Sequence, residues 1–194
     1  MNLLDEVDKI KKDGYSEANA EAKLCQDIII KAISQSSLNR NVTIKGGVVM
    51  RSLSKNARRA TQDLDLDFIR FSISEVCFQE DSASVLINSC EQMITEKLKS
   101  LMRFGTRSTR YKDVFDICYL SDLADMEKLR FCIQKYIYAD TTIDVNDADE
   151  IRRRAKRIFN SSTYKKQVER SKKNWLDLSV DEVLKKDLEF LYRI

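Results

Sequence analysis

The sequence predicts an α+β fold, with a small sheet and helices in residues 1–85 followed by a helical part over residues 86–194. The clearest alternation of apolar and polar residues, the pattern of a strand, lies before residue 86. Beyond it, apolar residues recur at steps of three and four, as in amphipathic helices. The chain also has no proline and only four glycines, whereas proline averages about 5% of soluble proteins. Long helices joined by short polar turns are therefore expected.

The first element predicted is a helix that runs from an N-cap at Ser16 to about Ser34. Asn19 stands where a full capping box has Glu or Gln, so the cap is a partial one. The expected buried stripe consists of Leu24, Ile28, Ile29, Ala32 and Ile33. The helix leads into a short strand at Asn41–Ile44.

The segment Lys45–Phe68 combines a diglycine, a basic stretch and alternating aspartates. Gly46 and Gly47 permit a tight turn close to a ligand, and a helix over Val48–Leu53 would offer its first N–H groups to phosphate oxygens. A strand over the aspartates would bury Leu64, Leu66 and Phe68 and place Asp63, Asp65 and Asp67 on its other face. Two such carboxylates, about 7 Å apart, suit a shared Mg²⁺ ion, because this cation prefers oxygen ligands.

The remaining elements are mostly helices. Ile69–Leu86 has room for one short strand, at Glu75–Phe78, and a loop. Later helices are marked by a capping box at Ser179–Glu182 and by a start at Asn146 or Asp147. Their apolar positions include Ile87, Cys90, Ile94, Leu98 and Leu101 in the first helix, and Met126, Leu129, Ile133 and Tyr136 in the next.

Composition excludes several classes of chemistry. Histidine is absent, so general acid or base catalysis, nucleophile activation and metal binding by histidine are excluded. The five cysteines are widely spaced and odd in number, which indicates reduced core residues and not a disulfide or zinc framework. No apolar run approaches 18 residues and the N-terminus is acidic, so a cytoplasmic protein with no membrane segment is expected.

Two blocks of the chain resemble the AbiEii/AbiGii-type toxins, a branch of the nucleotidyltransferase superfamily. One is the segment Lys45–Phe68, and the other is Glu96–Leu120, which is similar to the family's E-K-L…T-R-x-[KR]-D-x-x-D-[IL] block. The resemblance implies that Asp63 and Asp65 bind the metal and act in catalysis. It also implies a catalytic Lys97 and a late essential aspartate, either Asp113 or Asp116. The nucleotide-binding residues it implies are Lys45, Gly46, Gly47, Arg51, Arg59 and Thr61.

The resemblance further implies an activity and partners. The activity is Mg²⁺-dependent transfer of a nucleotidyl group from a nucleoside triphosphate, such as GTP or CTP, to an RNA acceptor such as the 3′ end of tRNA. The partner is a cognate antitoxin that represses transcription. One alternative is a shortened, catalytically impaired relative that only binds nucleotide or RNA. A third is a helical interaction protein, which requires the diglycine and aspartate pattern to be accidental.

The chain departs from the family in one place. In the family, a long stretch after the first block delivers a third carboxylate to the metal site, whereas only Ile69–Leu86 occupies that place here. Glu75, Glu80 and Asp81 lie in this stretch without matching a family pattern. Triphosphate binding is therefore expected to survive better than catalysis unless one of the three reaches the aspartate pair.

A basic segment runs from Asp147 to Lys173, with ten Lys or Arg residues against four acidic ones, in a chain of net charge +3. Such a segment suits a nucleic-acid backbone, because each neutralised phosphate releases counterions. A solvated helix face is the alternative. Tyr164 and Trp175 flank the segment, where they would either stack on bases or pack in the core.

Overall fold

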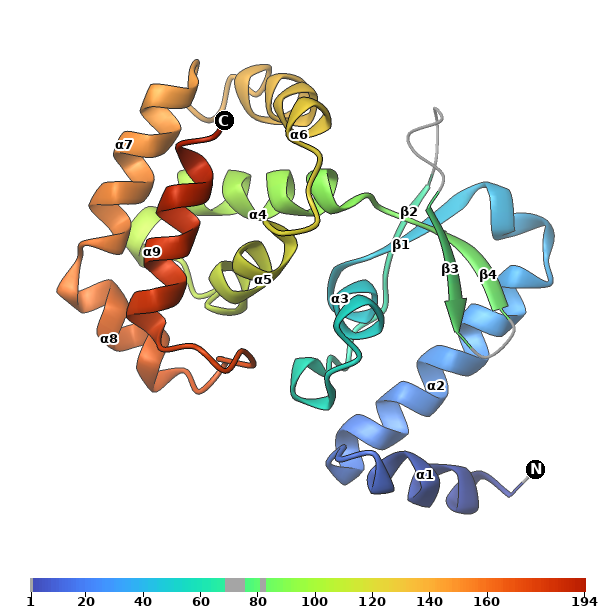
Figure 1. The fold of residues 1–194 in the computed structure, drawn as a ribbon. Coiled ribbons are helices and arrows are strands. Elements are labelled where there is room, and N and C mark those ends of the chain that lie inside the picture. Colours follow the sequence, from blue (N-terminus) through green and yellow to red (C-terminus); the bar gives the residue numbers. More distant parts are fainter. Residues whose placement is uncertain (1, 69–75, 81–82) are drawn as a thin grey trace. The chain divides into compact units, whose positions relative to one another are not determined.

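The structure is a computed structural model that describes residues 2–68, 76–80 and 83–194. The chain divides into two compact units, Met1–Ser89 and Cys90–Ile194 (Figure 1). The described residues form helices together with one small mixed sheet. The predicted α+β class is therefore confirmed.

The first unit holds the sheet. Its strands lie in the order β2-β1-β4-β3, with β1 antiparallel to β2 and parallel to β4, and β4 antiparallel to β3. Strand β1 is interior and buried, as expected for its apolar residues. The elements of this unit are α1 (Leu3–Lys12), α2 (Glu17–Ser34), η1 (Ser37–Arg40), β1 (Val42–Lys45), α3 (Gly46–Ser54), η2 (Ala57–Arg59), β2 (Asp65–Phe68), β3 (Val76–Glu80) and β4 (Ala83–Ile87).

The segment after β2 differs from its prediction, since it contains the two antiparallel strands β3 and β4 where one was expected. Ile87 ends β4 and does not begin a helix. Strand β4 buries Ala83, Val85 and Ile87, while Ser84 between them is exposed. This alternation is the signal of a strand, but it covers only five residues beside a long helical pattern.

The buried face of α2 also differs from its prediction. The buried residues are Ala20, Gln26, Ile30 and Ile33, whereas Ile28 and Ile29 are 46% and 45% exposed. Three consecutive isoleucines, at steps of about 100°, spread around more than half of a helix, so their periodicity does not select a face. Packing of α2 against β4 and the hydrogen bonds of Gln26 select it instead.

The second unit is helical throughout. Helix α4 packs on α5, α6 and α7, and α9 packs on α5, α7 and α8. The capping box at Ser179–Glu182 is confirmed, and Asp147 caps α7. None of the described helices combines the length and apolar character needed to cross a membrane. The elements are α4 (Cys90–Phe104), η3 (Gly105–Arg107), α5 (Lys112–Leu120), α6 (Met126–Ile133), the π-helical turn η4 (Gln134–Tyr138), α7 (Ala148–Phe159), α8 (Ser162–Arg170) and α9 (Val180–Leu191).

Candidate functional site

The diglycine forms the first turn of α3 and lies directly against two other predicted site residues. Gly46 has φ +69°, a left-handed conformation that glycine adopts without strain. A Cβ atom built on Gly46 would lie 2.2 Å from Asp65 Oδ2, and one built on Gly47 would lie 2.5 Å from the Cβ of Thr61. No side chain caps α3. The helix N-terminus and the Asp65 carboxylate therefore meet at this turn.

The three aspartates have different surroundings. Asp67 forms an ion pair with Lys45, whose Nζ lies 2.7 Å from its Oδ1. Asp63 and Asp65 are exposed, and their side chains have no hydrogen bond or ion pair with any residue that the structure describes. Asp65, beside Gly46, and Asp63 thus have no cationic partner among the described residues, whereas the charge of Asp67 is neutralised.

Strand β2 itself is shorter and more exposed than predicted. It begins at Asp65, so Asp63 precedes it and does not share a strand face with Asp65 and Asp67. Leu66 is 40% and Phe68 77% exposed, so the predicted burial of the apolar set is wrong. Strand β2 lies at the edge of the sheet, where a strand is covered on fewer sides than in the interior.

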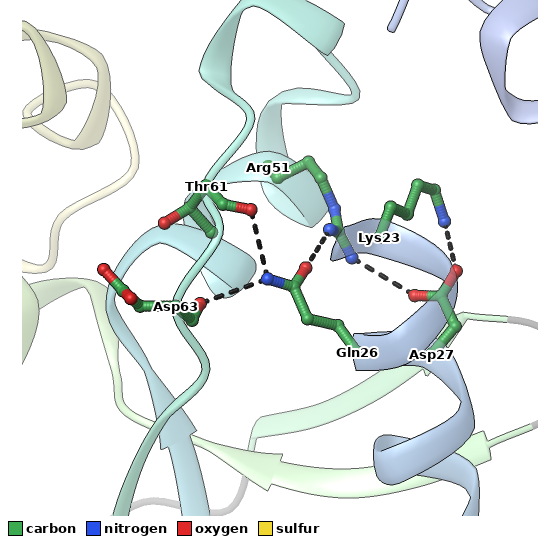
Figure 2. A network of polar contacts seen from close by, with 6 residues as sticks. All are labelled: Lys23, Gln26, Asp27, Arg51, Thr61 and Asp63. Carbon is green, nitrogen blue, oxygen red and sulfur yellow. Dashed lines mark hydrogen bonds and ion pairs between the residues drawn. The ribbon is translucent and has the colours of Figure 1, made fainter. Parts of the chain in front are cut away.

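A buried hydrogen-bond network fixes the segment that leads to Asp63. Gln26 Nε2 donates to the carbonyl oxygens of Thr61 at 3.1 Å and Asp63 at 3.2 Å. Its Oε1 accepts from Arg51 Nη1 at 2.5 Å (Figure 2). The backbone of this segment is therefore attached to α2, while the Asp63 carboxylate points away from Gln26. Sequence reasoning missed Gln26, although a glutamine among the apolar residues of α2 is a usable signal.

The network also explains where Arg51, one of the two predicted arginines, lies. Arg51 is 2% exposed and its Nη2 lies 3.2 Å from Asp27, which in turn pairs with Lys23 at 2.6 Å. Arg59 is 4% exposed, at the end of η2. Arg51 thus holds α3 against α2. Contact of either arginine with a nucleotide stays a prediction.

The second block places its predicted catalytic residues, Lys97, Asp113 and Asp116, in one buried cluster of the second unit. Lys97 Nζ, on α4, lies 2.7 Å from Asp116 Oδ2 and 3.3 Å from Asp113 Oδ1, both on α5. Asp116 is fully buried, and its Oδ1 accepts a hydrogen bond from Trp175 Nε1 at 3.0 Å. Asp113 retains 8% exposure, with Arg110 Nε 3.0 Å from its Oδ2. Breaking such a buried pair typically costs about 3–5 kcal/mol.

The two aromatic residues beside the basic segment belong to the core. Trp175 is 2% and Tyr164 1% exposed, so the hypothesis that they stack on bases is wrong. Trp175 packs beside Tyr119, with ring centroids 5.3 Å apart. Burial also raises the pKa of the Tyr164 hydroxyl. Trp175 therefore packs on α5, the helix that carries both aspartates of the cluster, and Tyr164 lies beside Tyr111 at the N-terminus of that helix.

A third metal-binding carboxylate is not among the described residues, which contain no group of three or more metal-ligating side chains. Glu80 ends β3, which is separated from β2 by β1 and β4. It also lies at the opposite end of the sheet from Asp65, because Glu80 pairs with Ala83 whereas the Ile87 end of β4 adjoins Ile44. Three strand spacings amount to roughly 14 Å, too far for one ion to bridge. Glu75 and Asp81 lie outside the described residues.

One buried acid in the second unit was not anticipated. Asp187, on α9, is 1% exposed, and neither carboxylate oxygen has a hydrogen-bond partner among the described residues. Burial raises its pKa well above the ordinary value, and the nearby Lys186 opposes this effect only in part. The pKa of the Cys118 thiol is also raised, to about 12, first by burial and then by Asp187. The native protein therefore favours a neutral Asp187.

Replacement of Asp187 by Asn should change how stability depends on pH. The raised pKa means that the folded state keeps a proton that the unfolded chain releases above about pH 4. This contribution to stability is complete below that pH and declines by about 1.4 kcal/mol per pH unit as the pH rises toward the folded-state pKa. Asn is neutral at every pH, so the advantage of Asp187→Asn should grow as the pH rises. Urea unfolding of both proteins between pH 4 and 8 measures the difference in their free energies of unfolding. A difference that does not change with pH would contradict the prediction.

Comparison with known families gives a match over most of the second unit. The family model described as nucleotidyl transferase AbiEii toxin, type IV TA system, matches residues 69–187, more than half of the 194 residues. The block Glu96–Leu120 lies inside the matched region, whereas Lys45–Phe68 precedes it. No curated protein and no solved structure gave a significant match.

Proposed function

Because this chain belongs to the AbiEii nucleotidyl transferase toxin family of type IV toxin–antitoxin systems, we propose that it transfers a nucleotidyl group from a nucleoside triphosphate to RNA in a Mg²⁺-dependent reaction. Family membership implies a nucleoside triphosphate substrate and a cognate antitoxin. The RNA acceptor, such as the 3′ end of tRNA, and an antitoxin that represses transcription are further parts of the proposal.

The observation that carries the proposal is the contact between the diglycine and Asp65. The uncapped first turn of α3 offers N–H groups to phosphate oxygens, and glycine lets those oxygens approach the backbone closely. Asp65 Oδ2 lies so near Gly46 that a Cβ there would be only 2.2 Å away. A phosphate and a carboxylate in such proximity repel each other, and a divalent cation between them removes the repulsion.

The two aspartates of this segment that pair with no described residue supply the ligand type that magnesium prefers. Asp63 and Asp65 present carboxylate oxygens, the ligands that Mg²⁺ prefers, and neither is paired with another described residue. We therefore assign them to the metal, which when bound would neutralise charge on the phosphates. Lys45 pairs with Asp67 at 2.7 Å. We therefore assign Asp67 to holding β1 against β2 and not to the metal.

The cluster around Lys97 supports a division of roles between the two aspartates of α5. Both oxygens of Asp116 are engaged, one by Lys97 and one by Trp175, and the residue is fully buried. We assign it to positioning Lys97. Asp113 is also paired through both oxygens, with Lys97 at 3.3 Å and Arg110 at 3.0 Å, but it keeps 8% exposure and its Arg110 partner is exposed, whereas Asp116 has no exposure. Asp113 is therefore the better candidate to accept a hydrogen bond from the acceptor hydroxyl.

The proposal is tested by incubating the purified chain with each labelled nucleoside triphosphate and total tRNA, with Mg²⁺ or with EDTA. Metal-dependent labelling of RNA that is lost in Asp65→Asn supports it. Metal-dependent triphosphate binding without transfer would favour the shortened relative that only binds nucleotide. If neither binding nor transfer occurs, the chain is an interaction protein and the proposal fails.

A further inference from the structure

The second unit contains a pocket of about 520 Å³ formed by the end of α4, by η3, by α7 and by Ser161, the N-cap of α8. It is separate from the cluster around Lys97, none of whose residues line it. Its polar lining consists of four arginines and two hydroxyl groups, with no acidic residue: Arg103, Thr106, Arg107, Arg154, Arg157 and Ser161.

Two of the four guanidinium groups are held in place by neighbouring residues. Arg103 Nη2 donates to Asp140 at 3.1 Å and Thr142 at 2.8 Å. Arg154 donates to Glu150 and to the carbonyl oxygen of Asp144. These contacts order the two side chains without neutralising the pocket, because each carboxylate also pairs with a second cation. Lys99 lies 2.5 Å from Asp140, and Arg153 pairs with Glu150.

The other two guanidinium groups, those of Arg107 and Arg157, are exposed and have no hydrogen bond or ion pair with any described residue. Arg154 and Arg157 are three residues apart on α7 and so lie on one face of it. Arg103, at the end of α4, and Arg107, in η3, line the same pocket. The pocket thus combines two ordered and two available guanidinium groups. Their planar donor forks match the oxygens of a phosphate.

The rest of the lining indicates what carries the phosphate. Phe104 is 50% exposed at the pocket, beside the arginines, and an exposed aromatic ring next to cations suits an unpaired base. The Ser161 hydroxyl accepts from Tyr164 N at 3.3 Å and can still donate outward. Arg153 and Lys156, also exposed on α7, extend the positive charge along the helix. An extended polyanion with bases fits these features better than a small anion or an acidic peptide.

We propose that this arginine pocket binds the phosphodiester backbone of a single-stranded part of the RNA acceptor, with Arg107 and Arg157 contacting phosphate and Phe104 stacking on a base. This inference rests on the proposed transfer to RNA. It goes beyond it by naming the surface that holds the acceptor.

The test measures binding of a fluorescently labelled single-stranded RNA by anisotropy, without nucleotide or metal, over a range of salt concentrations. Arg107→Ala/Arg157→Ala removes two charges that no described residue uses. We expect affinity at low salt to fall by about tenfold or more, and the slope of log K against log salt to lessen by about 1.4. Phe104→Ala should weaken binding by about fivefold or more without changing that slope.

The matched control is Lys128→Ala/Lys185→Ala, which removes the same charge from exposed positions on α6 and α9 outside the pocket. It should leave affinity and slope nearly unchanged. Equal losses in the control and the pocket variant, or no loss in the pocket variant, would overturn the inference. So would displacement of the RNA by inorganic triphosphate or polyglutamate as readily as by unlabelled RNA. If RNA binding depends on the pocket but no nucleotide is transferred, the RNA-binding role of the pocket stands and the transfer proposal fails. If the pocket variant transfers nucleotide as well as the unaltered protein does, the transfer proposal stands and the RNA-binding role of the pocket fails.

Discussion

Asp65→Asn should abolish metal-dependent triphosphate binding while leaving the protein folded. The substitution is nearly isosteric, but it removes one negative ligand from the assigned magnesium site and one charge from the N-terminus of α3. Loss of supporting residues alone costs metal sites about 10–100-fold, so loss of a ligand should weaken Mg²⁺-dependent binding by at least about 100-fold. Calorimetric titration with a triphosphate, with and without Mg²⁺, measures this. Asp63→Asn should act in the same direction.

Asp67→Asn is the matched control, because Asp67 lies on the same strand face as Asp65 but already pairs with Lys45. Loss of this partly exposed surface pair should reduce stability slightly, in the range of about 0–1 kcal/mol, and leave metal dependence in place. If Asp67→Asn abolished metal dependence and Asp65→Asn did not, the assignment of the metal ligands would be wrong.

The sequence predicted those elements whose local signals agree with their packing. Strand β1 and the capping box of α9 are confirmed, because apolar content and capping chemistry are determined within a few residues. The buried face of α2 was not predictable, because the three consecutive isoleucines do not define one. Packing against the sheet and the hydrogen bonds of Gln26 determine it. Strand β4 was obscured by the helical periodicity that follows it.

In the candidate site, too, local features were predictable from the sequence and long-range contacts were not. The diglycine and the aspartates are close together in the sequence and could be singled out from it. The proximity of Gly46 and Asp65 agrees with their proposed joint role, which stays a prediction. Contacts between distant positions were not accessible. Arg51 reaches Gln26 and Asp27 across about two dozen residues, and Trp175 reaches Asp116 across 59. Such distances along the chain leave no periodic signal.

Gly46→Ala should impair triphosphate binding as severely as loss of the Asp65 carboxylate, for two separable reasons. Its φ of +69° costs an L-residue about 1–2 kcal/mol. In addition, the new methyl group would lie 2.2 Å from Asp65 Oδ2 and 3.1 Å from its carboxyl carbon, so the carboxylate must leave its position beside the turn. We expect a folded but destabilised protein with at least about 100-fold weaker Mg²⁺-dependent binding. Thermal unfolding and calorimetric titration provide the two measurements.

Gly14→Ala separates the two causes, because Gly14 lies in the same unit with φ +94° but a Cβ there would meet only Ala57, at an ordinary 3.8 Å. This variant should lose stability through backbone strain and keep triphosphate binding. Gly47→Ala tests the steric cause alone, since its φ is not positive while a Cβ would lie 2.5 Å from that of Thr61. Gly47→Ala should therefore lose triphosphate binding, as Gly46→Ala does. If both diglycine variants bound triphosphate as well as Gly14→Ala does, phosphate would not approach this turn. The contact between the diglycine and Asp65 would then no longer support the proposed function.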